Sequence, residues 1–125
     1  MRPTIVFDFD GVIHKGYDGW RDGSIYGEID EGLLNYMSYL SQIYNIVISS
    51  CRPATQIVMF LDAYCRKNDI DLEFEIMDDR NMFWSKYGVV GVTNMKPAGA
   101  LYVDDRGFRY DNLKDFIKFM EGFGR

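Results

Sequence analysis

Asp8 and Asp10 are the first residues of this sequence whose types and spacing could do chemistry. They end an apolar run, Ile5 to Phe9, which is typical of a buried strand in a parallel sheet. Side chains alternate along a strand, so the two carboxylates should point to the same side. Gly11 can turn the chain through a positive φ directly after them. The stretch therefore predicts two acids aimed at one spot, with a solvated strand end as the alternative.

Short apolar stretches of the strand type alternate with amphipathic helical patterns along the rest of the chain. The strand-like stretches cover residues 45–50, 72–77 and 100–103, and 89–93 is ambiguous. The helical patterns cover residues 30–44, 53–67, 80–87 and 112–120, with Asp30 and Asn112 suited to N-caps. This alternation, without a linker, predicts a single α/β domain over residues 1–125. Its expected architecture is a three-layer, Rossmann-like parallel sheet with flanking helices.

Polar residues follow several of these strands, at the edge where an open α/β sheet places its site. The candidates beyond the first strand are Ser49, Ser50, Arg52, Lys96, Asp104 and Asp105. Clustered carboxylates without His or Cys are hard oxygen ligands that suit Mg²⁺. A lysine and a hydroxyl can bind the remaining oxygens of a phosphate, as phosphoryl transfer requires. The set therefore predicts magnesium-dependent chemistry on a phosphate ester.

The first two acids can divide the work of such a reaction. An Asp beside Mg²⁺ and a lysine stays ionised, so Asp8 could attack phosphorus and form an aspartyl phosphate. Asp10 could protonate the leaving oxygen and then deprotonate water. The spacing alone does not fix which acid takes which role. His14, a lone histidine in a polar loop, and the aromatic Tyr17 and Trp20 are more often structural than part of a site.

The order of these residues resembles the motifs of the haloacid dehalogenase-like (HAD) superfamily. Residues 5–13 resemble its first motif, an apolar run followed by Asp-x-Asp-Gly. Residues 46–50 are similar to the second motif, Lys96 with Pro97 to the third, and residues 102–105 to the fourth. The stretch from residue 94 to 106 particularly resembles small capless members. The resemblance covers residues 5 to 105.

This resemblance implies a HAD-like core without a cap domain and phosphatase activity on a small phosphorylated metabolite, such as a sugar phosphate or nucleotide. It implies that Asp8 is the nucleophile and Asp10 the general acid and base. Mg²⁺ would be held by Asp8, the main-chain carbonyl of Asp10, and the Asp104–Asp105 pair. It also implies that Ser50, with Lys96, binds the substrate phosphate. Gly11 and Arg52 are further candidates for phosphate binding, although Arg52 could instead be an ordinary salt-bridge partner.

Several alternatives stay open at this point. Ser49 could bind phosphate in place of Ser50, and Asp78–Asp79 could take the role of Asp104–Asp105, although no lysine loop precedes them. A phospho-receiver signalling domain, phosphorylated at Asp78 or Asp79, is an alternative function. So is a catalytically idle binding module on the same fold.

Composition and charge limit the class of protein. The 125 residues are 47% hydrophobic, which is enough for one domain with a real core. The net charge of −5 argues against a nucleic-acid partner. No apolar run is long enough for a membrane span. The sequence shows no signal-peptide pattern, and its two cysteines lack disulfide or metal spacing. We therefore expect a cytoplasmic protein.

The segment between residues 13 and 30 is too short for a cap domain. The site should therefore be open, unless a bulky substrate or another subunit of a homo-oligomer covers it.

Overall fold

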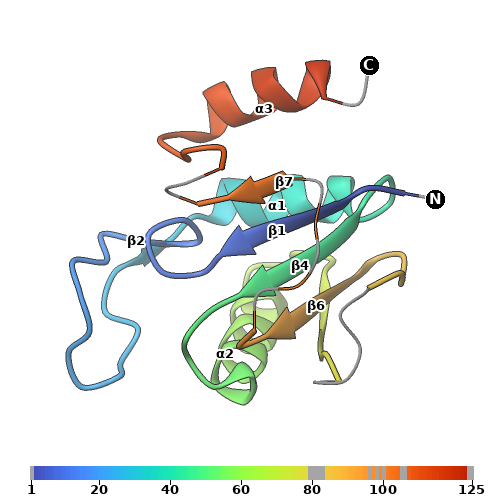
Figure 1. The fold of residues 1–125 in the computed structure, drawn as a ribbon. Helices are drawn as coiled ribbons and strands as arrows, with labels where there is room; N and C mark the ends of the chain where they lie inside the picture. Colours follow the sequence, from blue (N-terminus) through green and yellow to red (C-terminus); the bar gives the residue numbers. More distant parts are fainter. Residues whose placement is uncertain are drawn as a thin grey trace.

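A five-stranded parallel sheet forms the centre of the molecule, with the strand order β5-β6-β4-β1-β7 (Figure 1). The computed structural model describes residues 2–78, 84–95, 97, 99, 101–104 and 107–123. The strands are β1 (Thr4–Asp8), β4 (Asn45–Ser49), β5 (Glu73–Ile76), β6 (Val89–Thr93) and β7 (Leu101–Val103). The predicted α/β class with a parallel sheet is confirmed, and the ambiguous segment 89–93 is a strand.

Strand β1 lies between β4 and β7, and its register sets the level of the site. Asp8 pairs with Ser49 of β4, and Phe7 pairs with Val103 of β7. Ile5 and Phe7 are fully buried, as the apolar run predicts for a central strand. Because all the strands run in parallel, their polar carboxyl ends come to the same edge of the sheet.

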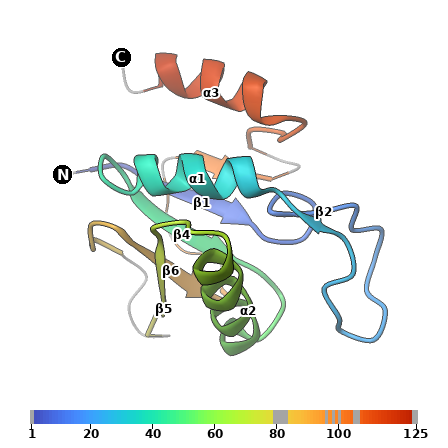
Figure 2. The same ribbon diagram turned by 180° about the vertical axis from the view of Figure 1, so that it is seen from behind.

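The helices are α1 (Glu31–Leu40), α2 (Ala54–Lys67) and α3 (Leu113–Gly122). Helices α1 and α2 cover one face of the sheet, and α3 lies beside its β7 edge (Figure 1). Figure 2 shows α1 and α2 in front of the strands, and the ring of Phe116 in α3 packs edge-on against Phe7 and Tyr36. Both predicted N-caps are confirmed. Asp30 accepts a hydrogen bond from the Leu33 N–H, and Asn112 accepts one from the Asp115 N–H.

The opposite face of the sheet lacks a helix within the described residues, so the expected three-layer arrangement is found only in part. Val6 and Val47 on this face are covered by Met77, Trp84 and Tyr102. The helix expected over residues 80–87 is not present from residue 84 to 87, and residues 80–83 lie outside the described part.

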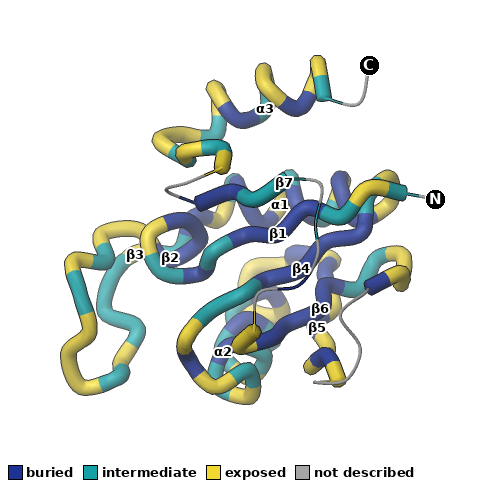
Figure 3. The backbone as a smooth tube through the Cα atoms, in the orientation of Figure 1, coloured by how far each residue is buried: buried dark blue, intermediate teal, exposed yellow. Residues whose placement is uncertain are grey.

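A small antiparallel ribbon, β2 (His14–Lys15) with β3 (Glu28–Ile29), follows β1. Between its strands, residues 16–27 form a loop, here called the β2–β3 loop, which projects from the body of the domain and whose residues are exposed or partly exposed (Figure 3). No helix in the described part of the chain has the length and apolar character needed to cross a membrane.

Candidate active site

The chain turns sharply at the end of β1, and this turn presents both acids at the carboxyl edge of the sheet. Gly11 has a φ of +88°, as its place after the acids predicts. The Gly11 N–H donates to the His14 carbonyl over 2.9 Å, and the His14 N–H donates to the Phe9 carbonyl over 2.8 Å. A Cβ placed on Gly11 would meet no atom within 4 Å, so the space beside the acids is open there.

A cavity of about 360 Å³ lies at this turn, between the ends of β1 and β7. Asp8, Asp10 and Asp104 line it together. Asp104 is 7% exposed, and its Oδ1 accepts a hydrogen bond from the Gly107 N–H over 2.8 Å. The structure thus brings together three of the four carboxylates that the sequence predicts. Asp105 lies outside the described residues.

A second, smaller cavity of about 190 Å³ lies between the ends of β1 and β4. It shares Asp8 and Asp10 with the first cavity and is also lined by Ser49, Ser50 and Tyr17. A group bound at the two acids could therefore reach into both cavities.

The two serines in this cavity have different partners. The Ser49 hydroxyl donates to the Met95 carbonyl over 2.8 Å, and so ties β4 to the loop that continues to Lys96. The Ser50 hydroxyl accepts a hydrogen bond from the Arg52 N–H over 3.1 Å, which leaves its own proton for another acceptor. These contacts favour Ser50 as the phosphate-binding hydroxyl. Lys96 itself is outside the described residues.

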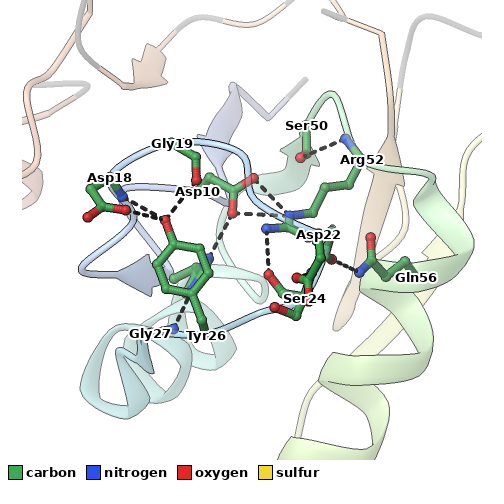
Figure 4. A network of polar contacts seen from close by, with 12 residues as sticks. Asp10, Asp18, Gly19, Asp22, Ser24, Tyr26, Gly27, Ser50, Arg52 and Gln56 are labelled. Atoms are coloured by element: carbon green, nitrogen blue, oxygen red, sulfur yellow. Dashed lines mark hydrogen bonds and ion pairs between the residues drawn. The ribbon is translucent and has the colours of Figure 1, made fainter.

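The Asp10 carboxylate is held from two sides (Figure 4). Arg52 Nε lies 2.9 Å from Asp10 Oδ2 and 3.1 Å from Oδ1. His14 Nδ1 lies 2.8 Å from Oδ1. Asp10 is thus not an isolated carboxyl group, and its role in proton transfer stays a prediction. In the structure, Oδ1 has two partners, whereas Oδ2 has the Arg52 contact alone within the described part of the chain.

The Arg52 side chain is 1% exposed, and its guanidinium contacts other groups of the protein. Its Nη1 donates to the Gly23 carbonyl over 2.7 Å and its Nη2 to the Ser24 carbonyl over 3.3 Å. The guanidinium therefore joins Asp10 to the β2–β3 loop. These three nitrogens already have protein partners. The predicted contact of Arg52 with substrate stays a prediction.

The β2–β3 loop is ordered further by its own side chains. The Tyr26 hydroxyl lies 2.8 Å from both Asp18 Oδ1 and the Gly19 carbonyl oxygen. Hydrogen bonds from Tyr26 and from Arg21 hold the pKa of Asp18 below its usual value. The Gln56 side chain of α2 donates to the Gly23 carbonyl over 2.7 Å. These contacts give the β2–β3 loop a defined position beside Asp10.

The carboxylates present suit Mg²⁺, although they do not form a complete metal centre by themselves. No group of three or more His, Cys, Asp or Glu within ligating reach is found among the described residues, which exclude Asp105. Mg²⁺ usually binds one or two protein carboxylates and completes its shell with water and substrate phosphate. Asp8 and Asp104, which line one cavity, provide the hard oxygen donors that this mode needs.

Asp78, the described member of the alternative acid pair, lies far from this site. Asp78 is exposed and follows β5, the edge strand, which is separated from β1 by β6 and β4. Three strand spacings amount to about 14 Å. Asp78 therefore does not join Asp8 and Asp10, and Asp79 lies outside the described residues.

Comparisons of the chain with models of protein families, with curated proteins and with solved structures find no match. The function must therefore be argued from the site itself, because a Rossmann-like sheet supports many activities.

His14 and Gln56 are the site residues that the sequence did not indicate. His14 is the only histidine in the chain and comes four residues after Asp10, but polar loops often contain a structural histidine. Only the glycine turn at Gly11 folds it back onto the acid. Gln56 carries no signal, since its partner is a main-chain carbonyl in a distant loop.

Proposed function

We propose that this protein is a Mg²⁺-dependent phosphomonoester hydrolase that works through an aspartyl phosphate at Asp8. One observation carries the proposal: Asp8 and Asp10 line two adjoining cavities, with Asp104 in one and Ser50 in the other. This arrangement supports a metal on one side of the acids and phosphate oxygens on the other.

In the first half of the reaction, an oxygen of Asp8 attacks phosphorus and the bond from phosphorus to the leaving oxygen breaks. Asp10 Oδ2, the less occupied oxygen, gives its proton to that leaving oxygen. In the second half, Asp10 takes a proton from water as the water oxygen attacks phosphorus. The bond to Asp8 breaks, and inorganic phosphate leaves. Bound Mg²⁺ would supply positive charge that offsets the charge on the phosphate oxygens.

The chain's own groups would bind the phosphate from the side of β4. The Ser50 hydroxyl can donate to a phosphate oxygen, and Lys96 is proposed to add a positive charge. The open space beside Gly11 lets a phosphate approach the turn closely. Cavities of about 360 and 190 Å³ suit a small phosphorylated metabolite, such as a sugar phosphate or nucleotide.

The proposal is tested with the purified protein, Mg²⁺ and a panel of phosphomonoesters. We expect release of inorganic phosphate that chelation of Mg²⁺ abolishes. Asp8→Asn should lower kcat/KM by at least about 10³-fold with unchanged thermal unfolding, because the amide is a poor nucleophile. Asp78→Asn, a change of the same chemistry at the distant acid, is the matched control and should keep full activity.

Two results would contradict the proposal. One is the absence of turnover across the panel, and the other is full activity of Asp8→Asn. A lasting acyl phosphate at Asp78 or Asp79 without turnover would instead identify a phospho-receiver domain.

A further inference from the structure

His14 occupies a position in the site for which the proposed reaction gives no role. Its side chain is 0% exposed and lies among the rings of Phe9, Tyr17 and Tyr26, with centroid distances of 5.2 to 5.7 Å. Each ring nitrogen has a partner, Asp10 Oδ1 for Nδ1 and the Gly27 N–H for Nε2. A buried imidazole satisfied at both nitrogens has a fixed orientation.

The two contacts define which nitrogen carries the proton. A main-chain N–H can only donate, so His14 Nε2, 2.7 Å from the Gly27 nitrogen, must accept with its lone pair. A neutral imidazole then carries its proton on Nδ1, which donates to Asp10 Oδ1 over 2.8 Å. The backbone at Gly27 therefore selects the tautomer that orients Asp10.

Gly27 can approach the ring this closely because it has no side chain. A Cβ at this position would lie 2.0 Å from the Lys15 carbonyl oxygen and 3.0 Å from His14 Nε2. Any other residue would push this end of the β2–β3 loop away from the ring. The loop end, the imidazole and the carboxylate thus form one connected chain of hydrogen bonds.

We propose that His14 is a positioning residue that holds Asp10 Oδ1, so that Oδ2 is presented to the leaving oxygen. The inference rests on the proposed phosphatase reaction. His14 does not touch substrate and transfers no proton. Its Nδ1–H occupies Oδ1 together with Arg52, and it fixes the rotation of the carboxylate about its terminal bond. Loss of this contact should therefore weaken the proton transfer to the leaving group more than substrate binding.

The first test is the tautomer, which needs no activity. Since His14 is the only histidine, ¹⁵N-detected NMR of the whole protein gives one pair of imidazole signals. We expect a protonated Nδ1 and an unprotonated Nε2 at neutral pH. A proton on Nε2, whether alone or together with one on Nδ1, would overturn the proposal independently of any assay.

The second test uses two variants that each keep one of the contacts. The amide nitrogen of His14→Asn falls near the place of Nδ1 and can still donate to Asp10. The amide of His14→Gln falls near Nε2 and can still accept from Gly27. We expect His14→Gln to lower kcat/KM for an alkyl phosphate by about 10- to 100-fold, with KM changed less than kcat, and His14→Asn to restore much of the loss.

Leaving-group chemistry separates positioning from a structural role. p-Nitrophenolate leaves with little help from an acid, so His14→Gln should lower kcat/KM for p-nitrophenyl phosphate only a few-fold. Equal losses for both substrates, or a better rescue by Gln than by Asn, would show a structural tether of the loop and overturn the proposal. Wild-type protein that hydrolyses neither substrate would refute the proposed function instead, while the NMR result would still stand.

Discussion

Two loops border the same carboxylates, and they are held in different ways. The β2–β3 loop is held by Arg52, whose Nε also binds Asp10. After β7, the described residues 104 and 107–112 are held by the Asp104–Gly107 hydrogen bond and by the Tyr110 hydroxyl, which donates to Asp30 over 2.7 Å. The first loop is connected to the carboxylate proposed as acid and base. The second is connected to the N-cap of α1.

From this difference we predict that one side of the site controls turnover and the other controls stability. A change in the contacts of the β2–β3 loop alters the surroundings of Asp10, so it should alter the chemical step. A change at Tyr110 removes a partner of Asp30, which caps α1, so it should act mainly on the free energy of unfolding.

Among changes to the contacts of the two loops, Arg52→Met should give the largest effect. It removes the cation from the Asp10 carboxylate and the donors from the Gly23 and Ser24 carbonyls. Loss of one partner of a largely buried ion pair destabilises by roughly 3 kcal/mol, and kcat/KM should fall by more than about 10-fold. Urea unfolding and the phosphatase assay measure the two effects.

Gln56→Ala is the matched control for this prediction, because Gln56 also binds the Gly23 carbonyl but not Asp10. It should change stability by about 1 kcal/mol and kcat/KM much less than Arg52→Met does. If Arg52→Met raised KM alone and left stability unchanged, Arg52 would be a substrate ligand, one of the two roles that the sequence leaves open, and the coupling between loop and carboxylate would be wrong.

Tyr110→Phe, after β7, should give a smaller effect than Arg52→Met. It removes the hydrogen bond to a buried carboxylate and should lower the free energy of unfolding by about 1.5–3 kcal/mol. Burial, and then the contact with Asp30, raise the pKa of Tyr110. The unfolded state therefore binds fewer protons above about pH 10, so stability falls as the pH rises beyond that value.

Urea unfolding between pH 8 and 11 measures this prediction. The wild-type protein should lose stability across the range more steeply than Tyr110→Phe, which lacks the titrating hydroxyl. Parallel curves for the two proteins would show that Tyr110 is not held protonated by the folded state.

The smallest of these effects should be a change in the rate of cysteine labelling, which tests whether phosphate binds in the smaller cavity. Cys51 is exposed and lines the smaller cavity, whereas burial raises the pKa of the Cys65 thiol to about 11. Iodoacetamide at pH 8 should therefore modify Cys51 rapidly and Cys65 slowly, as mass spectrometry can follow. Inorganic phosphate with Mg²⁺ should slow the reaction of Cys51 several-fold. An unchanged rate at saturating phosphate would place the phosphate outside this cavity.

Local patterns were sufficient to predict most of the elements. The apolar run before Asp8, the capping residues Asp30 and Asn112, and the positive φ at Gly11 depend on a few neighbouring residues. Parallel strands bring their carboxyl ends to one edge, so the meeting of Asp8, Asp10 and Asp104 also followed from the strand pattern.

The conformation of residues 84–87 could not be predicted in the same way. A short helix was expected over residues 80–87, but in the described part of this segment Trp84 packs on the sheet beside Val47 and donates from Nε1 to the Val89 carbonyl. Tertiary burial of a large aromatic residue outweighed a weak local preference for helix.

The parallel α/β sheet and the acids at the end of β1 could be predicted from the sequence, because they depend on short-range periodicity and on the geometry of parallel strands. The contacts of Asp10 are a property of the folded chain. Its contact with Arg52 joins residues 42 positions apart, and its contact with His14 depends on a turn that folds the chain back. Pairings of this kind are set by how loops pack on the finished sheet, which no local pattern records.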